Sequence, residues 1–376
     1  MSPHEELHRL LDLMIAHRAS DLVLTEGRPP LLRVVGDLRP AGETPLRAAD
    51  IEGVAAALLT PEQLTEFERT WEMDASYGLE GVARFRVNAF RQQGSMGVVI
   101  RMLPHEVPTL EGLGVPEIVK KWLLAPHGII ITTGPTGSGK STSQAAMIRF
   151  LNERKPYHVI TIEDPIEYTH QHGLCTIEQR ELGRDTQSFP EALRRVFRQS
   201  PDVIMIGEMR DLETFETALQ LAETGHLVLA TLHTGDATQA ISRIIDVFPA
   251  DQHQQVRVQL SLTLIGVVAQ ELLPRVDGQG RVLAAEVLEA TPAVRNLIRK
   301  NDLQQVYSVI QTSTAEGMVT MNGSLLQHFK QGRISLEQAL LFTSRQKELE
   351  QLIAREAHVH LGADGPKIRT LAGADR

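Results

Sequence analysis

The chemistry of this chain starts from one stretch, Gly134-Pro135-Thr136-Gly137-Ser138-Gly139-Lys140-Ser141-Thr142. It fits the phosphate-loop template G-x-x-x-x-G-K-[ST] at every fixed position. The glycines let the backbone turn so that its N–H groups point inward and form a concave site for anions. Lys140 is expected to reach the β- and γ-phosphates of a nucleoside triphosphate, and the Ser141 hydroxyl to ligate magnesium. We therefore predict that this stretch binds ATP together with Mg²⁺.

The flanking sequence has the order that a phosphate loop requires. The apolar run 129–131 precedes the loop and indicates a buried strand, and 142–153 indicates a helix after it. The N-terminus of that helix would direct its partial positive charge toward the phosphates. The alternative is a glycine-rich turn that binds nothing, and the strand–loop–helix context disfavours it.

Composition describes an ordinary globular chain. Of its 376 residues, 42% are hydrophobic and 23% charged, which suits two domains. The single cysteine, Cys175, excludes an intrachain disulfide and fits a reducing compartment. The N-terminus lacks the order of a signal peptide, and no apolar run approaches membrane-spanning length. We therefore expect a cytoplasmic protein.

The charge balance bears on the class of partner. A net charge of −9 and an isoelectric point near 5.9 argue against extended contact with nucleic acid phosphates, which usually needs a basic face. An aromatic content of 4% leaves few platforms on which bases could stack. We therefore expect no nucleic acid partner.

The first hundred residues predict a small mixed α and β domain. Helical and alternating patterns follow one another there, separated by turns such as Gly27-Arg28-Pro29-Pro30. A cluster of proline and glycine within 105–115 indicates the domain boundary. The predicted helices are 5–17, 50–59 and 61–70, and the predicted strands are 19–24, 31–35 and 83–90.

From Pro116 onward, apolar strands alternate with helices, which predicts a mostly parallel sheet. After a further strand the chain becomes helical, with helix starts at Thr291, near Met321 and at Ser335. The tail after Ala357 is expected to be disordered. The predicted strands are 128–133, 158–162, 203–206, 226–232 and 282–288, and the predicted helices include 188–199, 211–224 and most of 250–273.

Two acidic positions follow apolar strands, where parallel sheets place their ligand-binding edge. Glu163 ends the run before Asp164, and it is our candidate for orienting the attacking water. Glu208 follows the run 203–206 in a Walker B pattern in which Gly207 stands at the position of the usual magnesium-holding aspartate. Glu208 must then hold magnesium, partly through water, or act as the base itself. The sequence leaves the two roles of these carboxylates open.

The ordered motifs resemble those of type IV pilus retraction ATPases, the twitching-motility members of the secretion and pilus ATPase superfamily. The phosphate loop, the acidic box 161–170, the atypical Walker B run 207–211 and the histidine box 222–234 carry the resemblance, which extends from about residue 5 to residue 350. It implies that His226 and His233 lie near the nucleotide. Taken singly, a histidine at a strand end more often makes a structural hydrogen bond.

The resemblance also implies that arginines of the N-terminal domain reach the γ-phosphate. Arg86 and Arg101 are the candidates, with Arg84 less favoured, since a solvated strand face explains alternating arginines equally well. Gln93 and Ile100 depart from the family pattern. The further candidates for stabilising phosphate charge are Arg194, Arg195, Arg198 and Arg210.

Two features favour retraction over extension. Extension relatives carry a tetracysteine zinc insert, which one cysteine does not permit. The segment 293–299 resembles the retraction motif of the family. As plain chemistry, it is an amphipathic helix in which Arg295 and Arg299 lie one turn apart.

The resemblance implies a fold with a PAS-like N-terminal domain (1–104), a linker (105–115), a RecA-like ATPase core (116–290) and a helical C-terminal extension (291–356), followed by the tail 357–376. It implies a homo-hexamer that converts ATP hydrolysis into interdomain movement, with the nucleotide between the domains. An inner-membrane pilus platform protein and a paralogous retraction ATPase are the implied partners. The implied location is cytoplasmic, peripheral at the inner membrane.

Three other functions stay open at this point. The chain could be an accessory retraction ATPase or another secretion ATPase. It could be a RecA-like nucleic acid translocase, which predicts hydrolysis stimulated by DNA and salt-sensitive binding. It could also be a scaffold that binds ATP without hydrolysing it.

Overall fold

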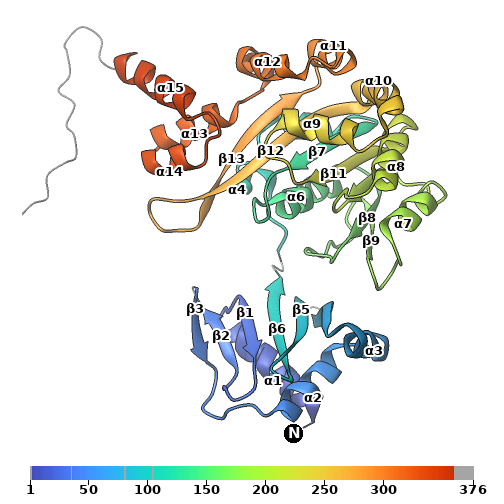
Figure 1. Cartoon of the computed structure of the whole chain (residues 1–376), viewed down its shortest axis with the longest axis vertical. Coiled ribbons are helices and arrows are strands. Elements are labelled where there is room, and N and C mark those ends of the chain that lie inside the picture. The colour runs from blue at the N-terminus through green and yellow to red at the C-terminus, as the bar shows by residue number, and fades with distance from the viewer. Residues whose placement is uncertain (1, 35, 80–81, 104–105, 360–376) are drawn as a thin grey trace, which may run out of the picture. The chain divides into compact units, whose positions relative to one another are not determined.

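The computed structural model describes residues 2–34, 36–79, 82–103 and 106–359. The chain divides into two compact units (Figure 1). The first unit contains the residues up to Val107 together with 162–171 and 179–188, and the second contains the remainder. The main division in the sequence falls between Val107 and Pro108. Because two later segments also belong to the first unit, the units cannot be separated at a single point in the sequence.

The first unit is built on a six-stranded sheet with the order β3-β2-β1-β6-β5-β4, in which neighbouring strands pair antiparallel. Its helices bury apolar faces, as in α1, where Leu7, Leu10, Leu11 and Met14 recur at helical spacing and are fully buried. The elements are α1 (Pro3–Ala16), β1 (Asp21–Leu24), β2 (Leu31–Val34), β3 (Asp37–Pro40), α2 (Ala48–Leu58), α3 (Pro61–Thr70), β4 (Glu72–Leu79), β5 (Ala83–Gln92) and β6 (Ser95–Leu103).

The second sheet has seven strands in the order β13-β12-β7-β11-β10-β8-β9. Strand β7 (Gly128–Thr133) lies between β11 (Leu227–Leu232) and β12 and is parallel to both. The other elements up to β13 are α4 (Leu110–Leu113), α5 (Ile118–Leu123), α6 (Lys140–Asn152), β8 (His158–Glu163), β9 (Thr176–Glu181), α7 (Phe189–Val196), β10 (Val203–Ile206), α8 (Leu212–Glu223), α9 (Ala237–Asp246), α10 (His253–Thr263), β12 (Leu264–Pro274) and β13 (Arg281–Glu289).

Strand β7 is buried along its whole length, because helices cover both faces of the sheet around it. Ile130 packs into a core shared with Met147 and Leu151 of α6. Ile129 and Ile131 point to the opposite face, as alternation along a strand requires. The predicted α/β class with a mostly parallel sheet is confirmed.

The prediction of helix for most of 250–273 is wrong in its second half. Helix α10 ends at Thr263, and the next eleven residues form strand β12. An apolar run bounded by a helix fits a helix and a strand equally well in a local window. The decision comes from pairing, because β12 joins β7 in parallel on one side and β13 in antiparallel register on the other. Gly266 of β12 allows α5 to pack closely on this strand, since a Cβ there would lie 2.4 Å from the ring of Trp122.

The C-terminal region is helical, as predicted. It comprises α11 (Pro292–Lys300), α12 (Val306–Thr312), α13 (Met321–Lys330), α14 (Leu336–Leu341) and α15 (Gln346–Val359). The side chain of Arg295 in α11 donates to the backbone carbonyls of Ser261, Leu262, Leu264 and Ala290. It thereby closes the C-terminal end of α10. The tail predicted to be disordered after Ala357 starts too early, because α15 continues to Val359, and residues 360–376 lie outside the described residues.

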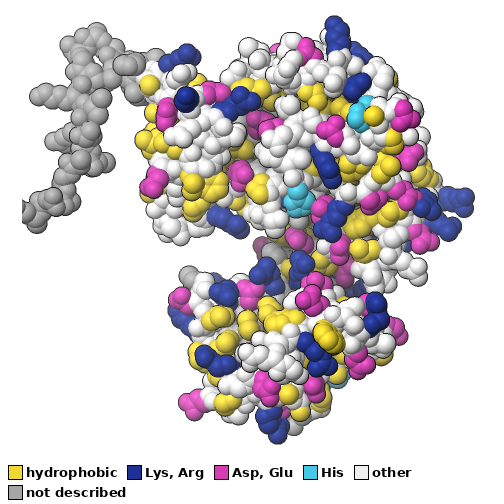
Figure 2. Space-filling model, in the orientation of Figure 1, with side chains coloured by type: hydrophobic (Ala, Val, Ile, Leu, Met, Phe, Trp, Pro, Cys, Tyr) yellow, Lys and Arg dark blue, Asp and Glu magenta, His cyan; other side chains and the backbone are white. Residues whose placement is uncertain are grey.

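Across the described ranges, no helix combines the length and the apolar character that crossing a bilayer requires. On the face drawn in Figure 2, acidic and basic side chains are interspersed over both units.

Candidate nucleotide site

The phosphate loop connects the carboxyl end of β7 to the first turn of α6. Its backbone needs glycine at Gly134, where φ is +144° and a Cβ would lie 2.3 Å from the carbonyl oxygen of Gln270. Gly137 and Gly139 also have positive φ, of +82° and +90°. The Lys140 ammonium donates to the carbonyl oxygens of Gly134 at 2.8 Å and Pro135 at 2.9 Å.

The residues of the loop fit the phosphates of a nucleotide. A Cβ added at Gly137 would meet no atom within 4 Å, so there is open space on that side of the loop. The Ser138 hydroxyl is buried, and within the described part of the chain its oxygen has no hydrogen-bond partner. A buried polar group without a partner is costly unless a ligand or water satisfies it. Ser141 is exposed in the first turn of α6, where its hydroxyl can reach a ligand or a cation.

His233 connects the phosphate-loop lysine to the Walker B carboxylate. Its Nδ1 lies 3.4 Å from Lys140 Nζ, and its Nε2 lies 3.3 Å from an oxygen of Glu208. Because an ammonium can only donate, Nδ1 accepts, and the proton of a neutral ring is then on Nε2 and directed at Glu208. The other oxygen of Glu208 lies 2.7 Å from Arg210.

The environment of Glu208 keeps it ionised. Burial raises the pKa of this carboxyl, but the hydrogen bonds and positive charge of Arg210 and His233 outweigh burial and hold the pKa below its ordinary value. At neutral pH, Glu208 is therefore a carboxylate, which is the form that can hold a cation or accept a proton.

Hydrogen bonds between neighbouring strand ends hold these residues in place. The Thr133 hydroxyl, at the end of β7, accepts from the backbone N–H of Thr234 at 2.9 Å. The Thr231 hydroxyl of β11 donates to the carbonyl of Gly207, which fixes the backbone just before Glu208. Thr231 lies within the histidine box 222–234, whereas no motif in the sequence points to Thr133. The local signal for Thr133 is its place at the end of the apolar strand before the phosphate loop.

Glu163 is the last residue of β8, as predicted, and is buried. One of its oxygens accepts from Gln179 Nε2 at 3.1 Å. Strand β8 neighbours β10 in the seven-stranded sheet, and Glu208 follows β10. Both carboxylates thus come at or just after the ends of apolar strands of one sheet.

The family model described as type II/IV secretion system protein matches residues 73–361. The chain belongs to this family. It is 46% identical to the type IV pilus retraction ATPase PilT of Pseudomonas aeruginosa, over 89% of this chain and 97% of that protein. It is 45% identical to the type IV pilus ATPase PilU of the same organism, over 93% of this chain and 91% of that protein.

A solved structure agrees with these similarities. The crystal structure of the pilus retraction motor PilT with bound ADP superimposes with a TM-score of 0.85 at 46% identity, over 93% of this chain and 99% of that one. The chain is accordingly an ATP-hydrolysing enzyme of this family, and it binds nucleotide. The resemblance inferred from the four motifs is confirmed.

The expectation that His226 lies near the nucleotide is wrong within the chain. His226 immediately precedes β11, and its carbonyl accepts from Gly128 N at the amino end of β7. His233 and the phosphate loop lie at the carboxyl ends of these two strands. The length of a six-residue strand, about 20 Å, separates the two ends. The His226 ring instead contacts the Leu221 carbonyl at 3.0 Å and lies perpendicular to the Phe197 ring.

The N-terminal arginines lie in the first unit on neighbouring strands. Arg86 of β5 is directly opposite Arg101 of β6 in the antiparallel register. Arg101 donates to Asp21 at 2.8 Å, and Arg86 lies 3.9 Å from Asp74. Burial raises the pKa of Asp21, but hydrogen bonds from Arg101 and Ser20 and the charges of the nearby arginines lower it below its usual value. Arg101 and Arg86 are therefore both held by carboxylates in this structure.

Arg84, the least favoured N-terminal candidate, forms an ion pair with Glu181, which is buried and belongs to the same unit. No local pattern indicates this pair, since the partners are almost a hundred positions apart. Arg194 pairs with Glu213 on the surface of the second unit. Arg195 and Arg198 are exposed near it.

Strand β12, which the sequence patterns predict as helix, supplies part of the nucleotide site. Gln270 of β12 lies under Gly134 and exchanges hydrogen bonds with the buried Ser143 hydroxyl of α6. A Cβ added at Gly139 would lie 3.2 Å from Leu272. The phosphate loop therefore packs against a strand that comes more than a hundred residues after it in the sequence.

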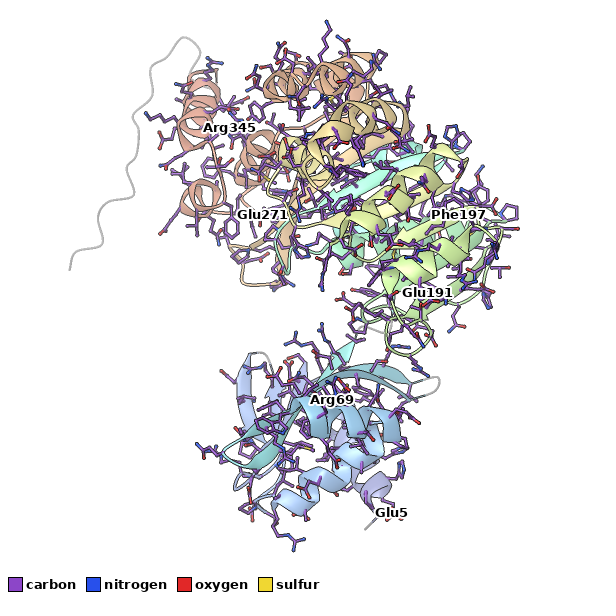
Figure 3. The ribbon with its side chains drawn as sticks, turned by 45° about the vertical axis from the view of Figure 1, so that its right-hand side comes forward. Glu5, Arg69, Glu191, Phe197, Glu271 and Arg345 are labelled. Carbon is purple, nitrogen blue, oxygen red and sulfur yellow. The ribbon has the colours of Figure 1, made fainter. Side chains whose placement is uncertain are left out.

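The same strand carries an acidic residue, Glu271 (Figure 3). Burial raises the pKa of Glu271, and the Lys140 charge opposes this rise. The local signal that favours a strand here is the β-branched pair Val267-Val268, since β-branched residues are enriched in strands.

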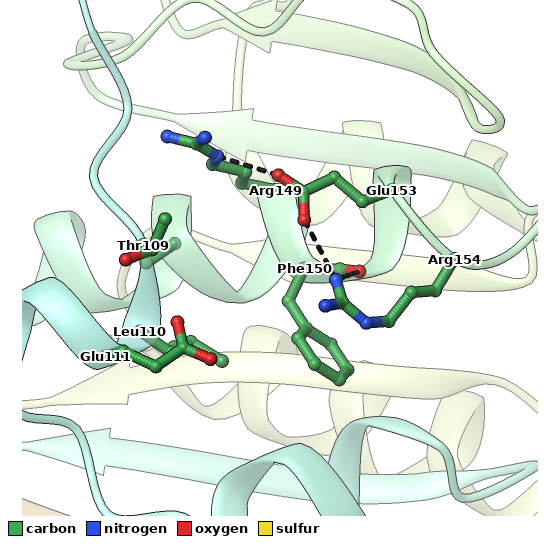
Figure 4. Close-up of a pocket in the computed structure, with 8 residues that line it drawn as sticks. Thr109, Leu110, Glu111, Arg149, Phe150, Glu153 and Arg154 are labelled. Atoms are coloured by element: carbon green, nitrogen blue, oxygen red, sulfur yellow. Dashed lines mark hydrogen bonds and ion pairs between the residues drawn. The ribbon is translucent and has the colours of Figure 1, made fainter.

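A small hollow elsewhere on α6 is not the nucleotide site. It has room for little more than a water molecule, about 20 Å³, and its lining includes Thr109, Glu111, Arg149 and Glu153 (Figure 4). Arg149 and Glu153, one turn apart at the C-terminal end of α6, form an ion pair at 2.9 Å. None of its lining residues belongs to the phosphate loop.

Proposed function

We propose that this chain is an ATP-driven motor for the retraction of type IV pili, and therefore for twitching motility. The observation that carries the proposal is the His233 bridge between Lys140 and Glu208, in a chain that matches PilT along nearly its whole length. The bridge connects Lys140, which would bind phosphate, to Glu208, which would bind the metal or orient the water.

In this proposal, ATP displaces Lys140 from the carbonyls of Gly134 and Pro135, because its phosphate oxygens are stronger acceptors for an ammonium. The Ser138 hydroxyl then gains a partner. The movement of Lys140 also changes its contact with His233, and through Nε2 it changes the restraint on Glu208. Nucleotide state is thereby communicated from the phosphate loop to Glu208.

Magnesium fits the residues at this site. Ser141 would hold it directly and Glu208 partly through water. When bound, it would neutralise charge on the β- and γ-phosphates. Arg86, Arg101 and Arg210 would supply further positive charge to the γ-phosphate. For this, Arg101 leaves Asp21 and Arg210 leaves Glu208. Each guanidinium then donates to phosphate oxygens instead.

The attacking water would be oriented by Glu163 or by Glu208, and one pair of variants distinguishes them. Glu163→Gln and Glu208→Gln are compared for ATP turnover over a magnesium series. A variant of the metal-holding carboxylate should recover part of its turnover at high magnesium. A variant of the base should not, because the missing acceptor cannot be replaced by the cation.

We also propose that the chain acts as a homo-hexamer at the inner membrane, against the pilus platform protein. Size-exclusion chromatography with light scattering, with and without nucleotide, tests the ring. A monomer at every concentration and with every nucleotide would contradict it.

An accessory role in retraction is the second candidate, because PilU is as similar to this chain as PilT is. Deletion of the gene distinguishes them. Loss of retraction in cells that keep every other pilus ATPase indicates the main motor, and retained but weaker retraction indicates the accessory role.

The test of the proposal as a whole is ATP turnover by the purified chain with and without magnesium, compared with Lys140→Ala. We expect magnesium-dependent turnover that the variant abolishes, and retraction in cells that is lost with it. Turnover that does not need Lys140 would remove the proposal, and stimulation by DNA would favour a translocase.

A further inference from the structure

One buried carboxylate of the second unit contacts two helices at once. Glu286 lies in β13 and is 3% exposed. Its Oε1 accepts from the backbone N–H of Ala237 at 3.0 Å. Burial raises the pKa of this carboxyl, and the backbone N–H groups of Ala237 and Met321 oppose the rise. Ala237 is the first residue of α9, and Met321 is the first residue of α13. The carboxylate therefore lies between two helix N-termini, each of which has a partial positive charge.

Neither helix needs Glu286 to begin. Asp236 caps α9 through the Gln239 N–H at 2.7 Å, and Thr320 caps α13 through the Gly323 N–H at 3.0 Å. Glu286 interacts with backbone N–H groups at the first positions of the two helices, which the cap side chains do not bond. Because a buried carboxylate costs free energy unless it is well bonded, its presence here suggests a role beyond capping.

The α9 side of this contact leads to the nucleotide site. Ala237 comes four positions after His233, whose Nδ1 is 3.4 Å from Lys140 Nζ. Between them, Thr234 is bonded to Thr133 at the end of β7. The segment 233–237 is thus held at one end by the phosphate loop and its strand and at the other by Glu286.

The α13 side leads into the C-terminal extension. Helix α13 is bonded along β13, where the Ser324 hydroxyl accepts from Ala285 N at 3.1 Å and His328 Nε2 contacts the Leu283 carbonyl at 2.8 Å. The Asn322 amide donates to the Arg345 carbonyl at 3.1 Å, just before α15. Arg345 lies among the helices of the extension, and its positive charge also acts on Glu286 (Figure 3).

We propose that Glu286 is a positioning residue that couples the segment 233–237 to the C-terminal helices, so that nucleotide at the phosphate loop changes the stability of α13 to α15. The inference rests on the proposed nucleotide chemistry of Lys140 and His233. Coupling of this kind is reciprocal, so a ligand that holds the extension changes the affinity for nucleotide by the same factor.

Two variants break the contact in different ways. Glu286→Gln keeps the volume but removes the negative charge and leaves a single acceptor oxygen, so the attraction to the two helix N-termini is weakened. Ala237→Pro removes the α9 donor and adds ring atoms at a fully buried position, while proline suits the first position of a helix. Asp236 already has an extended backbone, with φ −146° and ψ 171°, as a residue before proline requires. Ser324→Ala is the matched control, because it cuts a β13–α13 bond that does not involve α9.

The experiment is hydrogen exchange of the full chain with and without ADP, followed at the backbone amides of 321–330 and 346–356, together with the affinity for a fluorescent ADP analogue. In the unchanged chain, ADP should slow exchange in both segments. Glu286→Gln and Ala237→Pro should still bind the analogue, yet lose at least about half of the slowing at these segments. Ser324→Ala should exchange faster overall but keep the effect of ADP.

Equal slowing by ADP in all four proteins would overturn the inference while leaving the proposed function intact. Loss of the effect in Ser324→Ala as well would also overturn it, because any loosening of α13 would then suffice. Failure of the unchanged chain to bind the analogue would remove the proposed function and the inference with it.

Discussion

Lys140 Nζ lies 3.4 Å from Nδ1 of His233, a residue that follows a different strand of the same sheet. The contact makes the phosphate loop and the histidine box one site. Through Nε2 of the same ring, the site extends to Glu208 at 3.3 Å. A residue with two ring nitrogens is suited to this position, because one nitrogen accepts while the other donates.

Replacing His233 should therefore impair turnover more than folding. We expect His233→Ala to lower kcat by about 10- to 100-fold, since one or two hydrogen bonds to charged groups are lost. Steady-state turnover at saturating ATP and magnesium measures this. His226→Ala is the control, because it removes a histidine from the other end of β11 and should change kcat by less than about threefold. Equal losses in both variants would contradict the assignment of the site to one end of the strand.

Two glycines of the phosphate loop should respond differently to alanine. At Gly134, a methyl group would lie 2.3 Å from the Gln270 carbonyl, so Gly134→Ala should distort the loop and weaken nucleotide binding by at least about tenfold. At Gly137, φ is positive but no atom lies within 4 Å, so Gly137→Ala should cost only about 1 kcal/mol of backbone strain. Titration with a fluorescent nucleotide and thermal melts compare them, and the opposite ranking would count against the close approach of β12 to the loop.

Arg295 should stabilise the second unit more than its neighbour Arg299 does. Arg295→Ala removes the donor for four backbone carbonyls at the junction of α10, β12 and α11, and we expect a loss of about 2–4 kcal/mol in the free energy of unfolding. Arg299 makes one bond, at 3.3 Å to the Ser261 hydroxyl, so Arg299→Ala should cost less than about 1 kcal/mol. Urea unfolding measures both. Similar midpoints for the two variants would show that the carbonyl bonds add little.

His170 should make the fold sensitive to acid. Burial lowers the pKa of His170 from 6.5 to about 4, so the folded chain keeps the ring neutral where the unfolded chain already binds a proton. The free energy of unfolding should therefore fall as the pH is lowered from about 6.5 to about 4, by at most about 3 kcal/mol from this residue. His170→Gln should flatten this part of the pH dependence, as measured by urea unfolding at several pH values. An unchanged slope would mean that the ring is hydrated in solution.

Local sequence predicts secondary structure correctly where a short motif determines the conformation of its own backbone. It predicts the strand before Gly134, the turn and the helix that begins near Lys140, because a phosphate loop needs these three pieces in this order. It also predicts the helix starts at Thr291 and Ser335, since their hydroxyls accept from N–H groups three positions on. In each case, the residues that determine the structure lie within a few positions of one another.

The errors have a common cause in contacts between distant segments. The run 264–273 is a strand because β7 and β13 flank it, and neither partner is visible in a window of ten residues. His226 and His233 are equivalent in the motif, yet six strand residues separate them and place them at opposite edges of the sheet. Glu286 has no sequence signal, because its two N–H donors come from 49 positions before it and from the start of α13 after it.

By itself, the sequence determined that this chain binds nucleotide, that its second domain is an α/β fold and that its family is one of secretion and pilus ATPases. Those conclusions depend on residue types at short, fixed spacings. The tertiary structure alone decided which histidine meets Lys140, which strand supports the phosphate loop and which carboxylate joins the core to the C-terminal helices. Those choices depend on strand order and side-chain packing, which bring together groups that no local pattern relates.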